Sequence, residues 1–233
     1  MNTIKKWLEE KPVASVVLCL FIAIGTLRLL PMLGAQVGAN TDLIKGLVRA
    51  SVSLFLITLM IRLGWARDAG FSRPLGKWHK RWWLLMLPMA LVGLINIVGN
   101  DWTGVEFTAA ATALWLADNF AVGLFEETLL RGVCFYILYR AWREEPGGIM
   151  KAALMQGLLF GLLHLLNLFS NPLQDTLIQV LYATLLGFGF AGLTAFARSL
   201  WPAIMVHTFI DLTGSMNMLM ADAPVASESG DLA

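Results

Sequence analysis

Residues 120–138 read FAVGLFEETLLRGVCFYIL. Three ionisable side chains, those of Glu126, Glu127 and Arg131, lie in the middle of this otherwise apolar segment. On a soluble helix the same residues would form an ordinary solvated face. Within a membrane-spanning segment buried charge is costly, and such residues are by default candidates for a functional site. The segment therefore predicts a membrane helix that carries polar chemistry.

The composition of the chain favours a membrane protein. The 233 residues are 58% hydrophobic and 14% charged, whereas soluble domains are about 45–50% apolar and about 25% charged. The apolar residues occur in long blocks, which predicts an all-α polytopic fold rather than one soluble core. A net charge of +1 gives no basic field, so no nucleic-acid partner is expected. Cys19 and Cys134 lie in apolar blocks and are interpreted as buried hydrophobic residues.

The apolar blocks predict about seven spans. Their ranges are roughly 13–33, 46–63, 82–99, 108–141, 149–169, 174–197 and 200–220, and most approach the ~20 residues that a helix needs to cross the bilayer. The fourth is too long for one straight span, so it would tilt, break near Gly123 or begin with a surface helix. We divide the chain into an N-terminal transmembrane region of about three spans (1–107), a core that carries the polar motifs (108–213) and a disordered tail (221–233).

The distribution of positive charge predicts the orientation. If the N-terminus is cytoplasmic, 13 of the 17 Lys and Arg residues lie in or next to cytoplasmic segments. Lys45 and Arg49 count against this scheme. The bias follows the positive-inside rule. It predicts a multi-pass protein with the N-terminus in the cytoplasm and the C-terminus on the opposite side. We expect it in the plasma membrane of a prokaryote, with membrane lipid as a partner.

Two further motifs in apolar surroundings predict that the polar residues meet. They are Phe160…His164 and His207…Asp211, and in each the two side chains share a helical face. Counted from the nearest cytoplasmic charge, Glu126, His164 and Asp211 lie roughly 20 Å along their helices, and His207 about 13 Å. Separate helices that bring acid and imidazole groups to a similar depth indicate one buried polar site.

Helical spacing predicts different roles for the two adjacent glutamates. Glu127 and Arg131 are four residues apart and can form a salt bridge along their own helix. Glu126 lies about 100° around the helix and can face another neighbour. We therefore assign Glu127 and Arg131 a mainly structural role and Glu126 the chemistry. A carboxylate with two imidazoles, screened from bulk water, is suited to activating water and stabilising an oxyanion.

Three motifs together resemble the signatures of the CAAX-protease and bacteriocin-processing family of intramembrane proteases, in the manner of type II CAAX prenyl endopeptidases. They are Glu126-Glu127-x-x-x-Arg131, Phe160-x-x-x-His164 and His207-x-x-x-Asp211. The resemblance covers about residues 108–213. It implies an all-α membrane fold with a buried cavity, and an endopeptidase that hydrolyses a membrane-associated protein or peptide substrate.

The resemblance also implies roles for the site residues. Glu126, helped by His164, would activate the hydrolytic water, and His207 and Asp211 would stabilise the oxyanion. The residues Glu127, Arg131 and Phe160 would support this site. No cofactor is required by a glutamate-type mechanism. A metal-dependent mechanism is the other alternative, in which Glu126, His164, His207 and Asp211 would hold zinc.

Two other functions are compatible with the sequence. A non-proteolytic immunity or scaffold protein on the same fold would use the polar site for structure or ligand binding. A proton-coupled transporter would also place Glu, Asp and His inside its spans, but the chain shows no repeat with broken helices of the kind found in many transporters.

Overall fold

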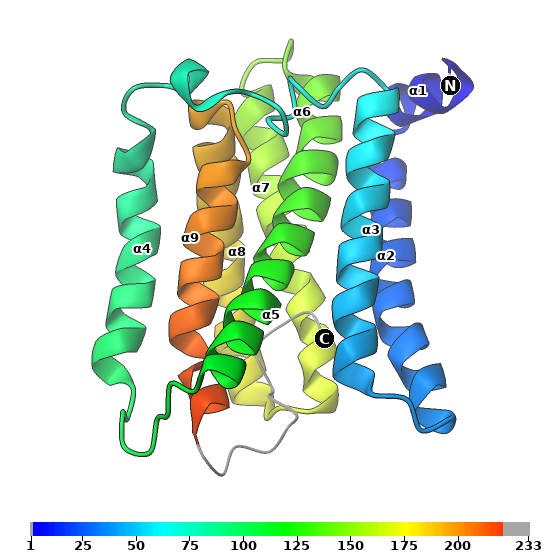
Figure 1. Ribbon diagram of the computed structural model, residues 1–233. Helices are drawn as coiled ribbons and strands as arrows, with labels where there is room; N and C mark the ends of the chain where they lie inside the picture. Colours follow the sequence, from blue (N-terminus) through cyan, green and yellow to red (C-terminus); the bar gives the residue numbers. More distant parts are fainter. Residues whose placement is uncertain (1, 221–233) are drawn as a thin grey trace.

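The computed structural model describes residues 2–220, and over this range the chain consists of helices joined by loops, without a strand (Figure 1). The only β-type pairing in this range is an isolated bridge between Val105 and Met220. The predicted all-α class is therefore confirmed. The predicted disordered tail, residues 221–233, lies outside the described residues.

The helices follow one another along the chain with mostly short connections. The α-helices are α1 (Asn2–Glu10), α2 (Pro12–Gln36), α3 (Thr41–Arg62), α4 (Trp82–Gly99), α5 (Ala109–Glu127), α6 (Tyr136–Trp142), α7 (Gly148–Leu163), α8 (Leu173–Ala197) and α9 (Trp201–Gly214). Three short 3₁₀ segments are η1 (Leu75–Lys77), η3 (His164–Phe169) and η4 (Met216–Leu219). The segment η2 (Thr128–Phe135) is a π-helix that joins α5 to α6 without a loop.

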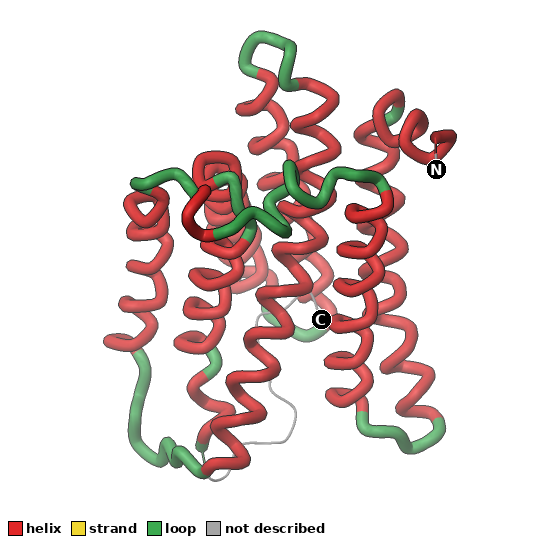
Figure 2. Tube along the Cα trace, turned by 45° about the horizontal axis from the view of Figure 1, so that its top comes forward, coloured by secondary structure: helices red, strands yellow, loops and turns green. Residues whose placement is uncertain are grey.

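The long helices form a bundle whose loops gather at its two ends (Figure 2). Helix α7 packs along α8, α4 along α9, and α2 along α3. Helix α5 runs obliquely through the bundle and contacts both α9 and α3 (Figure 1). This oblique course places the C-terminal end of α5, with its two glutamates, among helices from both halves of the chain.

The outer surface of the bundle is apolar. Large side chains such as those of Phe21, Val98 and Leu114 are mostly exposed, far beyond what a water-soluble protein tolerates. Among the described residues, five helical segments are long and apolar enough to cross a membrane: Pro12–Gln36, Thr41–Arg62, Trp82–Gly99, Gly148–Phe169 and Leu173–Ala197. The predicted count of seven spans therefore differs from the count that helix length and hydropathy support. The two remaining predicted spans contain α5, which carries the acidic residues of the polar motif, and α9, which has only 14 residues.

The fourth predicted span does not break near Gly123. The helix continues through Gly123, which lies against Thr208 of α9, and tilts across the bundle. The change in geometry comes after Glu127, where the π-helix η2 begins. Segments of π-helix are rare and are often found at functional sites. Of the alternatives expected for this long span, a break near Gly123 is therefore wrong, and α5 takes an oblique course through the bundle.

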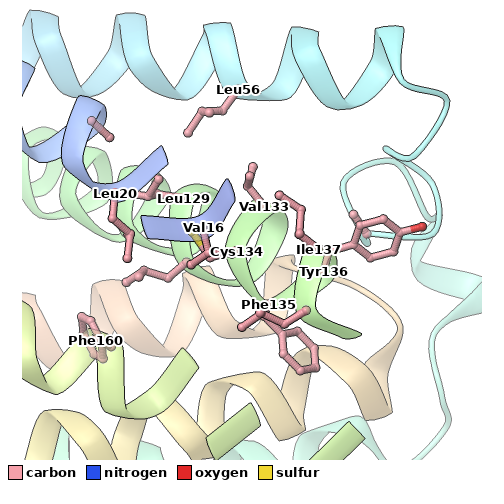
Figure 3. Packing of buried hydrophobic residues seen from close by; sticks show 14 of the residues in the cluster. Val16, Leu20, Leu56, Leu129, Val133, Cys134, Phe135, Tyr136, Ile137 and Phe160 are labelled. Carbon is pink, nitrogen blue, oxygen red and sulfur yellow. The ribbon is translucent and has the colours of Figure 1, made fainter. Parts of the chain in front are cut away.

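The segment η2 is the centre of the main hydrophobic core. All eight of its residues are buried. Figure 3 shows Leu129, Val133 and Cys134 of this segment packed with side chains of α2 and α3, among them Val16 and Leu56. This packing surrounds the π-helix with apolar contacts and holds the preceding glutamates in a fixed orientation.

Candidate active site

A cavity of about 620 Å³ lies between α4, α5, α7, α8 and α9. Glu126, His164, His207 and Asp211 all line it, together with the ring of Phe160. The structure thus brings together the four residues that the sequence placed at a similar depth on three separate spans. Glu126, His164 and His207 are buried, and Asp211 is more exposed, with 19% of its side chain accessible.

Glu127 and Arg131 form the ion pair that helical spacing predicted. Arg131 Nη1 donates to Glu127 Oε1 at 2.8 Å, and both side chains are completely buried. The guanidinium carbon of Arg131 lies 4.6 Å from the centre of the Phe160 ring and 4.7 Å from that of the Phe190 ring. The charge of Arg131 is therefore balanced by Glu127 and by two aromatic faces.

Glu127 also holds His207, a contact that the sequence did not predict. The Nδ1 atom of His207 lies 2.6 Å from Glu127 Oε1. An ionised carboxylate can only accept, so Nδ1 carries the hydrogen. The other ring nitrogen, Nε2, lies 3.6 Å from Glu126 Oε2 and 3.6 Å from Asp211 Oδ2. The bond to Glu127 therefore fixes the orientation of the His207 ring, with Nε2 on the side of Glu126 and Asp211.

The orientation of His164 is set by its own helix. His164 lies at the junction of α7 and η3, and its Nδ1 is 2.9 Å from the carbonyl oxygen of Phe160. A carbonyl oxygen can only accept, so Nδ1 carries the hydrogen and Nε2 is the nitrogen that can accept a proton. The ring meets that of Phe160 edge to face, with the ring centres 4.9 Å apart. Phe160 thus walls the cavity beside the imidazole, as its spacing predicted.

Two further residues shape the cavity and were missed in the sequence. The Phe190 ring of α8 stacks on His207, with the ring centres 5.1 Å apart and an angle of 14° between the planes. Tyr182, also on α8, lines the cavity. Tyr182 could have been noticed as a polar side chain within an apolar span. Phe190 has no such signal, because a phenylalanine in a membrane helix usually faces lipid or core.

Ser215 is at the end of the cavity but is held in a packing network. Its hydroxyl donates to Asn119 Oδ1 at 3.0 Å and accepts from Trp115 Nε1 at 3.0 Å. These bonds tie the end of α9 to α5. Arg49 of α3 similarly bonds Asp118 of α5 at 3.0 Å. The network fits a role of Asp118 and Asn119 in helix packing, and Ser215 lacks a neighbouring base among its bonded partners.

The arrangement was also compared with a zinc site. Within residues 2–220 no group of three or more His, Cys, Asp or Glu side chains is placed so as to hold a metal ion. We therefore derive the chemistry from the protein groups alone.

Comparison with known proteins adds an independent result. No curated protein matches the chain significantly, and neither does any solved structure. The family model described as "Type II CAAX prenyl endopeptidase Rce1-like" matches residues 107–213. These residues contain the whole set Glu126, His164, His207 and Asp211. Residues 107–213 are therefore similar to the Rce1-like family of proteases, and residues 2–220 contain five helices that are long and apolar enough to cross a membrane.

Proposed function

We propose that the protein is an intramembrane endopeptidase that hydrolyses a peptide bond of a membrane-associated protein or peptide. One observation carries this proposal. A single buried cavity holds the carboxylate of Glu126 together with two histidines whose Nδ1 atoms are already engaged, by Phe160 and by Glu127. Both imidazoles therefore have Nε2 as the nitrogen for proton transfer or hydrogen bonding in the reaction.

Glu126 and His164 are proposed to activate water. Glu126 is the buried carboxylate on the wall of the cavity, and its neighbour Glu127 is committed to Arg131 and His207. A water molecule between Glu126 and His164 would give up a proton as its oxygen attacks the scissile carbonyl carbon. The same proton would then be delivered to the departing amine as the C–N bond breaks. Atoms and charge balance without another reactant.

His207 and Asp211 are proposed to act on the carbonyl oxygen. In its protonated form, His207 can donate from Nε2 to the oxyanion while Nδ1 keeps its bond to Glu127. Asp211 Oδ2, at 3.6 Å from Nε2, is placed to orient the ring and balance its charge. Fixed donors in a site screened from water stabilise an oxyanion more strongly than water does.

The surroundings of these groups suit a substrate in the membrane. Apolar side chains of α4, α8 and α9, including Leu186 and Ile210, line the rest of the cavity. The volume of about 620 Å³ accommodates a short extended stretch of peptide rather than a small solute alone. We further propose that the protein lies in a prokaryotic plasma membrane. Its N-terminus would be in the cytoplasm and its C-terminus on the opposite side.

The test begins with a comparison of cells that carry the wild-type protein or Glu126→Gln, because a protease leaves uncleaved substrate in the variant membranes. Purified protein in lipid nanodiscs should then cleave the candidate substrate. Glu126→Gln and His164→Ala should each lose at least 100-fold in rate, about the contribution of one positioned acid–base group. Glu144→Gln and His79→Ala are matched controls, since both residues are exposed and lie outside the cavity.

Three outcomes would contradict the proposal. Full cleavage by both Glu126→Gln and His164→Ala would remove these residues from the chemistry. A protective or scaffolding effect in cells that persists with Glu126→Gln, without any cleaved product, would favour the non-proteolytic alternative. Proton-driven solute flux into liposomes would favour a transporter.

A further inference from the structure

A second cavity, of about 470 Å³, is lined by Arg131, the last residue of the motif that begins at Glu126. It lies where four parts of the chain meet: the loop between α3 and α4, the segment from η2 to the end of α6, the start of α7 and the end of α8. None of its lining residues lines the proposed catalytic cavity. It is therefore a separate site.

Arginine dominates the wall of this second cavity. Arg73, Arg131, Arg143 and Arg198 line it, against the single acidic residue Asp68. Arg131 is paired with Glu127, and Arg143 with the exposed Glu144 at 3.1 Å. Within residues 2–220 no salt bridge is found for Arg73 or Arg198. The cavity thus carries positive charge that the protein itself does not neutralise.

Several polar atoms at this cavity are buried without a hydrogen bond from the protein. They are Nε of Arg73, Nε and Nη2 of Arg131, and Oγ1 of Thr194. Arg131 is fully buried and Thr194 is 6% exposed. Leaving a buried donor without an acceptor costs free energy, more so for a charged group. Three side chains with this deficit around one cavity indicate a ligand that supplies several acceptor oxygens.

The position of the cavity indicates where that ligand comes from. Arg73, Arg143 and Arg198 all belong to segments that the positive-inside rule places at the cytoplasmic end of the bundle. Trp142 and Trp201 lie at the same end, as expected where a helix leaves the hydrocarbon core. The cavity is therefore at the level of the lipid headgroups and within reach of cytoplasmic solutes.

We propose that this cavity binds a phosphate oxyanion, held by Arg73, Arg198 and the hydroxyl of Thr194. Guanidinium groups bind phosphate through paired hydrogen bonds and are the preferred side chains for it. Arg131 closes the inner wall, so the bound anion would lie behind the guanidinium that holds Glu127. The phosphate could belong to an anionic phospholipid or to a soluble phosphate compound, which present the same chemistry.

The experiment compares full-length wild-type protein with Arg73→Gln/Arg198→Gln. The matched control is Lys77→Gln/Lys80→Gln, which removes two charges from the same end of the bundle at exposed positions outside the cavity. In detergent, binding of inorganic phosphate is measured by calorimetry. In nanodiscs of phosphatidylcholine with or without phosphatidylglycerol, retained phosphatidylglycerol is measured by native mass spectrometry. Thr194→Val, which removes only the hydroxyl, serves if the double variant does not fold.

At least about a tenfold loss of affinity is expected for the arginine variant, because each charged hydrogen bond contributes that much or more. The lysine control should bind like the wild type. Phosphate binding in detergent identifies a soluble ligand, and selective retention of phosphatidylglycerol identifies a lipid. Equal binding by all variants in both assays, or no binding by the wild type in either, would overturn the proposal.

Discussion

Replacing Glu127 by Gln should destabilise the protein far more than replacing a surface glutamate. The substitution keeps the shape of the side chain and removes its charge. At 2.8 Å from Arg131 Nη1, the gross attraction is about 6 kcal/mol for an effective dielectric constant of about 20. A neutral Gln retains a hydrogen bond of about 1 kcal/mol. The expected loss in free energy of unfolding is therefore about 3–5 kcal/mol, the range for breaking a buried pair.

The matched comparison is Glu145→Gln. Glu145 bonds Lys151 at 3.0 Å, but both side chains are about half exposed, so the expected loss is about 0–1 kcal/mol. Reversible unfolding in mixed micelles, followed by tryptophan fluorescence, measures the free energy of unfolding of both variants. The double variant Glu127→Gln/Arg131→Met should lose less than the sum of the two single variants, because it leaves no unpaired buried charge. If Glu127→Gln and Glu145→Gln are equally stable, the buried pair does not hold this site.

Three further predictions concern packing, metal and orientation. Gly187→Ala should lower the free energy of unfolding by about 1–3 kcal/mol, because a Cβ there would lie 3.0 Å from the Gly157 backbone of α7. Gly192→Ala on the same helix meets nothing within 4 Å and should be neutral or stabilising. Thermal unfolding of the two variants tests this difference. Cleavage should persist after dialysis against a chelator, and loss of activity that added zinc restores would refute the metal-free mechanism. A secreted phosphatase fused after Asp101 should be active and one fused after Gly76 inactive; the reverse pattern would overturn the predicted orientation.

The sequence was sufficient for the fold class and for predicting that Glu126, His164, His207 and Asp211 meet in one cavity. Long apolar blocks leave few alternatives to membrane helices, since the backbone must satisfy its own hydrogen bonds in lipid. Residue spacing along a helix is fixed, so the Glu127–Arg131 pair and the shared face of Phe160 and His164 followed directly. The number of spans did not follow from the sequence. Helix α5 carries polar residues and α9 has only 14 residues, so neither meets a criterion of length and hydropathy for a membrane span.

Only the tertiary structure showed which nitrogen of His207 each of the adjacent glutamates approaches. Helical spacing separated Glu126 from Glu127, but it could not show that Glu127 reaches across to α9 and bonds Nδ1 of His207 at 2.6 Å. It also gave no sign that Phe190 stacks on that ring, or of the arginine-lined cavity behind Arg131. These features depend on how separate helices cross and rotate against one another. Local periodicity fixes which residues share a face, whereas the packing of whole helices fixes which faces meet.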